Sequence, residues 1–314
     1  MEVENNIQVF VPNAIIPPIP EIVRYLPFVL HHWYRLTFPN IGKTIHEAIG
    51  SSAEIILSDS VFFPFIPKFI EPKAFIFRVP DFLSGFWASN KALLESESRL
   101  LHNADLVVTS SRLLQLDLSQ TQQIDAKFLS NGVESSRFEK EMDIPEEYIK
   151  SKKPKAIYIG ALKIWFDLEL LTYLAEAKPE WDFYIIGDQD NLAYLPKVAN
   201  IYFLGEKSQA ECVPYLQHAT TGIIPFQLDT NDLVNHINPI KLYEYLAVGI
   251  PVVSTHWKEL ELIDAPIFLA DSPESFVSML EDSLSSSPQD RDQRKLFADK
   301  FTWDSIASSL LEML

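Results

Sequence analysis

The segment from Asn238 to Val253 holds the residues best suited to chemistry, and it reads NPIKLYEYLAVGIPVV. Lys241 and Glu244 are three residues apart, so on a helix they share one face. An ammonium in the first turn of a helix, together with the free backbone amides there, suits an anion such as a diphosphate. An ionised carboxylate one turn later only accepts hydrogen bonds, which suits the vicinal hydroxyls of a ribose.

The residues around this pair predict a helix followed by a buried strand. Asn238 suits the N-cap and Pro239 the first helical position. Gly249 suits the end of the helix, where a left-handed residue stops it before the strand. An ordinary solvated ion pair on a surface helix has the same pattern, so a binding role needs support from elsewhere in the chain.

Short β-branched and aromatic runs alternate with helical patterns along the chain, which is typical of an α/β protein with parallel sheets. Strands are expected at 7–11, 55–57, 75–77, 106–109, 127–129, 156–159, 182–186, 201–204, 221–224, 251–254 and 267–269. Helices are expected at 91–103, 167–177, 208–217, 239–247, 273–284, 291–300 and 303–314. With 314 residues, this predicts two Rossmann-like domains, with helices on both faces of the sheets.

Composition excludes several classes of protein. The formal net charge is −17 and the sequence pI is near 4.8, so no basic field gathers phosphates and no nucleic-acid partner is expected. Cys212 is the single cysteine and no basic-then-apolar leader opens the chain, which favours a reducing cytoplasm. The most apolar stretch, residues 55–70, is interrupted by charges and prolines, so no transmembrane helix is expected.

The run from Asn238 to Ser254 resembles the donor-site signature of family 4 glycosyltransferases, which have the GT-B fold and build bacterial surface polysaccharides. Further segments resemble the family in the same order. They are the loop GALKIWFD at 160–167, the strand and turn YIIG at 184–187, IIPF at 223–226, ADLVVTS at 104–110, SNGV at 130–133, and Glu95. The resemblance covers nearly all of the chain and is strongest over residues 158–255.

This resemblance implies a metal-independent enzyme that moves a sugar from a nucleotide diphosphate to a hydroxyl of a glycan or lipid-linked acceptor. Its co-substrate is the nucleotide sugar, and no further cofactor is implied. Residues 134–154 are charged and carry no strand signal, so the linker is placed there. Residues 1–141 would be the acceptor-side domain and 142–301 the donor-binding domain. The last helix, 302–314, would cross back to the first domain and bury a stripe of apolar side chains that includes Trp303.

The resemblance also implies the donor site. Lys163 and Lys241 would meet the diphosphate, Glu244 would hold the ribose, and backbone amides near Gly160 and Asn238 would help. The other implied positions are Gly187, Phe226, Pro239 and Leu242. Cations and amides placed in advance stabilise the negative charge that develops on a leaving diphosphate. Lys163 also fits a solvated loop lysine, but the position of its loop favours the binding role. Trp165 and Phe166 fit packing residues better than base-stacking ones.

Two residues are candidates for catalysis. Asp81 follows the strand at 75–78, where a carboxylate could take a proton from an acceptor hydroxyl or simply cap the next helix. His236 stands where the family has an acidic residue facing the donor sugar, and it fits a sugar contact or an exposed loop histidine. Asp188 and Asp190 match a metal-binding Asp-x-Asp pair, but caps of a βα turn explain them better. No metal site is expected.

The first domain departs from the family at its opening, where about fifty residues, at least one βα unit, are missing relative to relatives. Either the true start lies upstream or part of the cleft is lost. Segment 12–39 fits an interfacial patch for a lipid-linked acceptor at the inner face of the membrane, or a loop and helix buried under the sheet. His31 and His32 fit packing rather than a metal. A nucleotide-sugar epimerase and a non-catalytic donor-binding descendant remain the rival functions.

Overall fold

A computed structural model describes residues 2–4, 7–9, 35, 40–62, 64–83, 85, 91–189, 194–228 and 232–314. The chain divides into two compact units. Unit 1 comprises residues 1–110 and 114–128 with Leu314, and unit 2 comprises 111–113 and 129–313. Each unit has its own hydrophobic core.

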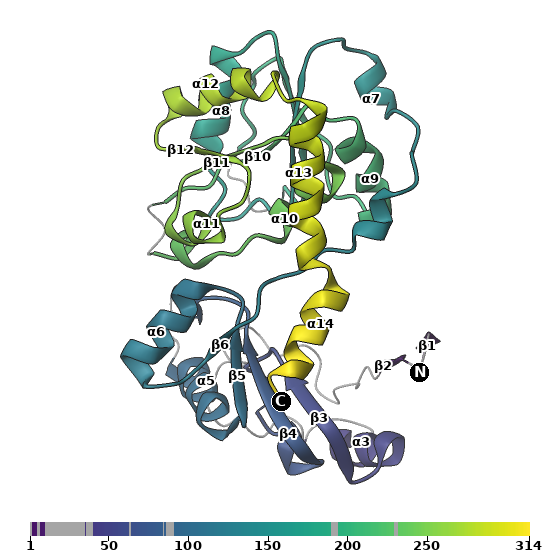
Figure 1. The fold of residues 1–314 in the computed structure, drawn as a ribbon, viewed down its shortest axis with the longest axis vertical. Helices are drawn as coiled ribbons and strands as arrows, with labels where there is room; N and C mark the ends of the chain where they lie inside the picture. Colours follow the sequence, from purple (N-terminus) through teal and green to yellow (C-terminus); the bar gives the residue numbers. More distant parts are fainter. Residues whose placement is uncertain are drawn as a thin grey trace. The chain divides into compact units, whose positions relative to one another are not determined.

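Unit 1 contains a four-stranded parallel sheet in the order β3-β4-β5-β6 (Figure 1). Its strands are β3 (Ser52–Ser58), β4 (Glu71–Val79), β5 (Leu106–Thr109) and β6 (Lys127–Phe128). Its helices are α3 (Ile41–Ile49), α5 (Lys91–Asn103) and α6 (Arg112–Gln122). Phe75, Phe77, Leu100 and Val107 are buried between the sheet and its helices, and this burial stabilises the unit.

Unit 2 contains a six-stranded parallel sheet in the order β12-β11-β10-β7-β8-β9. Its strands are β7 (Lys155–Ile159), β8 (Asp182–Ile186), β9 (Ile201–Phe203), β10 (Thr221–Ile224), β11 (Val252–Thr255) and β12 (Phe268–Ala270). The central strands are buried on both faces, since every residue of β8 and β10 is buried. Such strands read as largely apolar runs in a sequence, which helps to predict their limits.

Helices cover both faces of this second sheet (Figure 1). The helices of unit 2 are α7 (Glu146–Ile149), α8 (Leu168–Ala177), α9 (Gln209–Gln217), α10 (Ile240–Val248), α11 (Lys258–Ile263), α12 (Pro273–Ser283), α13 (Pro288–Ala298) and α14 (Trp303–Glu312). Of these, α14 buries no residue. The β7–β8 and β10–β11 crossovers run in opposite directions, so right-handed connections place α8 and α10 on opposite faces.

Ligands of such sheets bind where the strand order reverses, at the carboxyl ends of the strands. Here that point lies between β7 and β10.

The predicted α/β class with parallel sheets is confirmed, and the strand expected at 7–11 is present over its described residues, 7–9. Residues Ile7–Val9 form β2, which pairs antiparallel with β1 (Glu2–Glu4) and belongs to neither parallel sheet. Pairing with the adjacent segment closes a very short loop, which costs less chain entropy than joining a distant sheet.

The segment predicted as a linker packs on unit 2 instead. Gln217 of α9 donates from Nε2 to the carbonyls of Phe138 and Lys140, at 3.1 and 2.8 Å. Tyr148 of α7 is 2 % exposed and lies in the core of unit 2. The structure therefore divides the chain at residues 128 and 129, ahead of the expected boundary at 141 and 142.

Candidate functional site

A cavity of about 590 Å³ lies at the carboxyl ends of β7 and β8, next to the start of α9. We call it the β7–β8 cavity. It is lined by Ile159, Gly160, Ala161, Lys163, Ile186, Gly187, Asp188, Glu206, Lys207 and Ser208. Three predicted donor-site residues, Gly160, Lys163 and Gly187, thus meet in one cavity. Lys207 is a second cation in the same wall, and sequence reasoning missed it because the run GEKS looks like an ordinary solvated loop.

Two glycines give the cavity its backbone floor. Gly160 has φ +148°, a conformation that residues with a side chain rarely adopt. A Cβ at Gly187 would overlap the carbonyl oxygen of Gly160, so the two turns touch backbone to backbone. The amide of Gly160 donates to the carbonyl of Ile186 at 3.0 Å, which holds the turns together. A ligand can approach the main chain closely where no side chain covers it.

Lys241 stands beside the Gly160 turn. A Cβ at Gly160 would lie 3.0 Å from Lys241 Cε and 3.2 Å from Nζ. The ammonium also lies 5.0 Å from the ring centroid of Tyr158 and 4.8 Å from that of Phe226, distances at which aromatic faces attract a cation. Burial lowers the pKa of Lys241 to about 8, and Glu244 opposes this. The site therefore holds a partly desolvated cation that gains from a bound anion.

Glu244, on the same helix α10, is partnered by an arginine that sequence reasoning missed. Arg137 Nη1 lies 3.5 Å from Glu244 Oε1, and Arg137 Nη2 lies 3.1 Å from Glu134 Oε2. Burial raises the pKa of Glu244, while Arg137 and Lys241 lower it. Arg137 lies in a 3-10 helix within the segment predicted as a linker, so no signal pointed to it. The carboxylate is 21 % exposed, which leaves it open to a hydroxyl donor.

The N-terminus of α10 is built differently from the prediction. Pro239 is the N-cap residue and no side chain caps the helix, so the predicted Asn238 cap is wrong. The reason is that Asn238 Nδ2 donates to Ser130 Oγ at 3.4 Å, while Asn131 Nδ2 donates to the Asn238 carbonyl at 2.6 Å. Ser130 also bonds the hydroxyl of Tyr243 at 2.8 Å. The loop at residues 130–131 therefore holds the start of α10 in place.

Leu242 has a packing role. Its side chain is fully buried in the core, and its amide donates to the Pro239 carbonyl at 3.0 Å. Neither group is offered to a ligand in this geometry. Gly249, in contrast, ends α10 as predicted, with φ +89° in the left-handed region.

The loop after β7 is fixed to the end of β10. Phe166 pairs antiparallel with Phe226, the amide of Asp167 donates to Pro225, and the amide of Gln227 donates to Trp165, both at 2.8 Å. Phe166 is 4 % exposed and Phe226 is 2 % exposed, so both rings pack in the core. Lys163 is exposed, with Nζ 5.9 Å from the Trp165 ring centroid. The loop is thus pinned while its lysine faces the β7–β8 cavity.

The two catalytic candidates belong to different units and have different surroundings. Asp81 follows β4 in unit 1, and its side chain is exposed. Desolvation by the surrounding protein raises the pKa of Asp81, while the charge of Arg78 lowers it. His236 in unit 2 is 5 % exposed, so the reading as an exposed loop histidine is wrong. Its Nδ1 lies 3.0 Å from the Asp232 carbonyl oxygen, which orients the ring.

Across the described parts of the chain, no group of three or more His, Cys, Asp or Glu side chains could hold a metal ion. Asp190, His31 and His32 lie outside those parts, as does segment 12–39 except for Arg35. Within the same parts, no helix is long and apolar enough to cross a membrane.

Comparisons with known proteins agree with this geometry. Residues 153–286 match the family described as "Glycosyl transferases group 1". The chain is 23 % identical over 238 residues to the "Putative teichuronic acid biosynthesis glycosyltransferase TuaH" of Bacillus subtilis (strain 168). That match covers 71 % of this chain and 59 % of the length of the relative.

Solved structures with the same fold include the sucrose-phosphate synthase of Thermosynechococcus elongatus. Its TM-score is 0.74 at 14 % identity, covering 96 % of this chain and 81 % of that one. Anabaena Alr3699/HepE in complex with UDP-glucose has a TM-score of 0.68 at 15 % identity, covering 88 % and 80 %. The predicted GT-B fold and the resemblance to glycosyltransferases are confirmed.

Proposed function

We propose that this chain, which has the GT-B fold and a glycosyl transferases group 1 domain in unit 2, transfers a sugar from a nucleotide diphosphate to an acceptor hydroxyl. The observation that carries the proposal is the convergence of Gly160, Lys163, Gly187 and Lys207 on one cavity, with Lys241 beside the Gly160 turn. Two bare backbone turns and three lysines suit a diphosphate leaving group. The acceptor class we propose is a glycan or lipid-linked saccharide of a surface polysaccharide, as the name of the TuaH relative suggests.

The residues would divide the work as follows. Lys241 and Lys163 neutralise the charge that gathers on the diphosphate as the glycosidic bond breaks. Glu244, oriented by Arg137, accepts hydrogen bonds from the ribose hydroxyls. Lys207 and Ser208, at the start of α9, border the part of the cavity farther along the sheet and would meet the nucleoside. His236 would contact the donor sugar, and Asp81 would take the proton from the acceptor hydroxyl.

A uridine nucleotide is the first donor to test, because the HepE complex named above holds UDP-glucose. Incubation with labelled UDP-sugars and a saccharide acceptor should give a labelled product together with free UDP. Addition of EDTA should leave the rate unchanged, because every proposed group is a protein cation, carboxylate or imidazole. Conversion of the donor without transfer would indicate an epimerase. Binding of UDP without any turnover would indicate a donor-binding protein and would contradict the proposal.

A further inference from the structure

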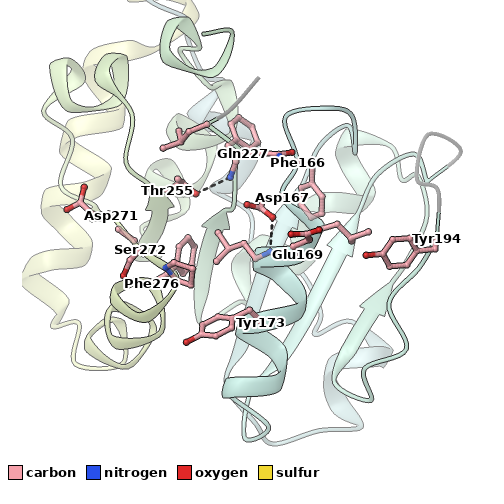
Figure 2. Close-up of a pocket in the computed structure, with 16 residues that line it drawn as sticks. Phe166, Asp167, Glu169, Tyr173, Tyr194, Gln227, Thr255, Asp271, Ser272 and Phe276 are labelled. Carbon is pink, nitrogen blue, oxygen red and sulfur yellow. Dashed lines mark hydrogen bonds between the residues drawn. The ribbon is translucent and has the colours of Figure 1, made fainter. Parts of the chain in front are cut away.

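A second cavity, of about 550 Å³, is lined in part by Phe166 and Asp167 of the loop after β7 (Figure 2). It opens at the carboxyl ends of β10, β11 and β12, next to the first turns of α8 and α12. We call it the β11–β12 cavity. Its lining residues are Phe166, Asp167, Leu168, Glu169, Leu170, Tyr173, Tyr194, Phe226, Gln227, Leu228, Thr255, Ala270, Asp271, Ser272, Pro273 and Phe276. Its volume is within the ~300–1,000 Å³ of ligand pockets.

Aromatic rings form much of the wall. Phe166, Phe226 and Phe276 are buried and therefore fixed in position. Tyr173 on α8 and Tyr194 present their rings more openly, at 39 % and 59 % exposed (Figure 2). An exposed tyrosine at a cavity rim offers a flat apolar face with a polar tip, which suits a ligand that has both kinds of surface.

The described lining residues include three carboxylates, Asp167, Glu169 and Asp271, and no lysine, arginine or histidine. The Asp167 carboxylate accepts a hydrogen bond from the amide of Leu170 at 2.7 Å. An oxygen of the Asp271 carboxylate lies 2.7 Å from His256 Nδ1. These contacts hold both carboxylates in place. Gln227, with its side-chain carboxamide, and Thr255, with its hydroxyl, line the same cavity. The β7–β8 cavity, by contrast, carries Lys163 and Lys207. The three carboxylates of the β11–β12 cavity therefore disfavour phosphates and carboxylates and offer acceptors to hydroxyl groups.

We propose that the β11–β12 cavity is a binding site for a neutral oligosaccharide. Sugar rings combine apolar C–H faces, which pack on aromatic rings, with hydroxyls that donate to carboxylate and amide oxygens. The choice of a glycan over other neutral polyhydroxy compounds rests on the proposed function, since a glycosyltransferase meets saccharide chains. The cavity and its charge do not depend on that function.

The test uses the full chain and soluble probes. Maltotriose and cellotriose serve as neutral probes, trigalacturonic acid as the anionic probe and UDP as the probe of the other cavity. Saturation-transfer NMR should show contact with at least one neutral trisaccharide, and titration should give a dissociation constant that UDP does not abolish by competition. Trigalacturonic acid should bind at least about tenfold more weakly, because three carboxylates line the cavity.

Tyr173→Ala and Tyr194→Ala locate the site. Each should weaken trisaccharide binding by about fivefold or more, as expected when an aromatic anchor is removed. Both residues are exposed, so the variants should fold. Tyr202→Ala is the matched control, because Tyr202 on β9 is also 39 % exposed and does not line the cavity. The control should bind trisaccharide like the unmodified chain.

The outcomes are separable from those of the proposed function. Absence of neutral trisaccharide binding at millimolar concentration, equal binding of trigalacturonic acid, or unchanged binding by both tyrosine variants would each overturn this inference. All three could occur while UDP still binds and sugar transfer proceeds. Trisaccharide binding that depends on Tyr173 and Tyr194 would support the site even if UDP failed to bind, a result that would count only against the proposed function.

Discussion

At the scale of single residues, Lys241 shows how burial prepares a group for a ligand. Its ammonium lies over two aromatic rings and beside the Gly160 turn, and burial lowers its pKa to about 8. Aromatic faces satisfy a cation only in part, so some electrostatic stabilisation is left for an anion. A diphosphate bound nearby would raise the pKa again by favouring the charged form.

This pKa predicts how nucleotide binding depends on pH. Below pH 8, Lys241 of the free protein is charged and the affinity for UDP is highest. Above pH 8, Lys241 is mostly neutral and must take up a proton when UDP binds. The affinity for UDP should therefore fall by up to about tenfold per pH unit above pH 8. Calorimetric titration between about pH 6.5 and about pH 9.5 measures this. Lys241→Arg keeps its charge, so its profile should be flat. The same pH dependence of UDP affinity in Lys241→Arg and in the unmodified protein would show that another group titrates.

Glu244 gives a second prediction at this scale. If its carboxylate accepts from the ribose, the protein should prefer UDP to 2′-deoxyuridine diphosphate by about 1.5 to 3 kcal/mol, the range for hydrogen bonds to a charged group. Glu244→Ala should lose this preference. Glu134→Ala should retain it, because Glu134 contacts the same Arg137 but is 59 % exposed. If Glu244→Ala weakened the binding of both nucleotides equally, the carboxylate would affect the diphosphate or the folding of the protein, and it would not contact the 2′-hydroxyl.

At the scale of elements, the two glycine turns decide whether a ligand reaches the backbone. Gly187→Ala places a Cβ against the Gly160 carbonyl, which is main chain and cannot rotate away. Gly205→Ala meets no atom within 4 Å and suffers only the strain of φ +71°, about 1–2 kcal/mol. Gly187→Ala should therefore weaken UDP binding by about tenfold or more, and Gly205→Ala should not. Urea unfolding separates lost stability from lost affinity. Unchanged UDP affinity in Gly187→Ala would show that the turns do not shape the site.

The final helix supplies a prediction that differs from the sequence expectation. Trp303 was expected on a buried stripe of a helix crossing to the first domain, but it is 44 % exposed and no residue of α14 is buried. Its ring packs on Gly132, and its amide donates to the Val133 carbonyl at 3.2 Å. Trp303→Ala should cost about 1–2 kcal/mol, below the ~3–5 kcal/mol of a fully buried tryptophan. Urea unfolding measures the loss, and a value above about 3 kcal/mol would contradict a half-exposed Trp303. The crossing itself remains a prediction.

Elements differ in how far the sequence predicted them. The limits of β5, β8 and β10 agree with the sequence, because β-branched and aromatic runs buried on both faces leave little ambiguity. The short helix α11 was missed, since six residues hold too few turns to show a period. Asn238 was misassigned because a side chain that suits an N-cap can equally bond a distant loop, here Ser130. Arg137 joins the site through tertiary packing, which no local pattern encodes.

At the scale of the whole molecule, two cores imply two cooperative units. Scanning calorimetry should show two unfolding transitions, and UDP should raise the midpoint of only one, because the proposed nucleotide residues all lie in unit 2. At 100 times the dissociation constant the stabilisation should be about 2.7 kcal/mol. Lys241→Met should abolish the shift and leave the other transition unchanged. A single transition that UDP moves as a whole would contradict independent unfolding of the units.

The pinned loop at residues 163–167 borders both cavities, with Lys163 on one side and Phe166 and Asp167 on the other. A displacement that one ligand imposed on this loop would therefore also alter the wall of the other cavity. Thermodynamic linkage then requires reciprocity: the factor by which a saccharide changes the affinity for nucleotide equals the factor by which the nucleotide changes the affinity for saccharide. Through this shared wall, occupancy by a glycan chain would set how tightly the sugar donor is held.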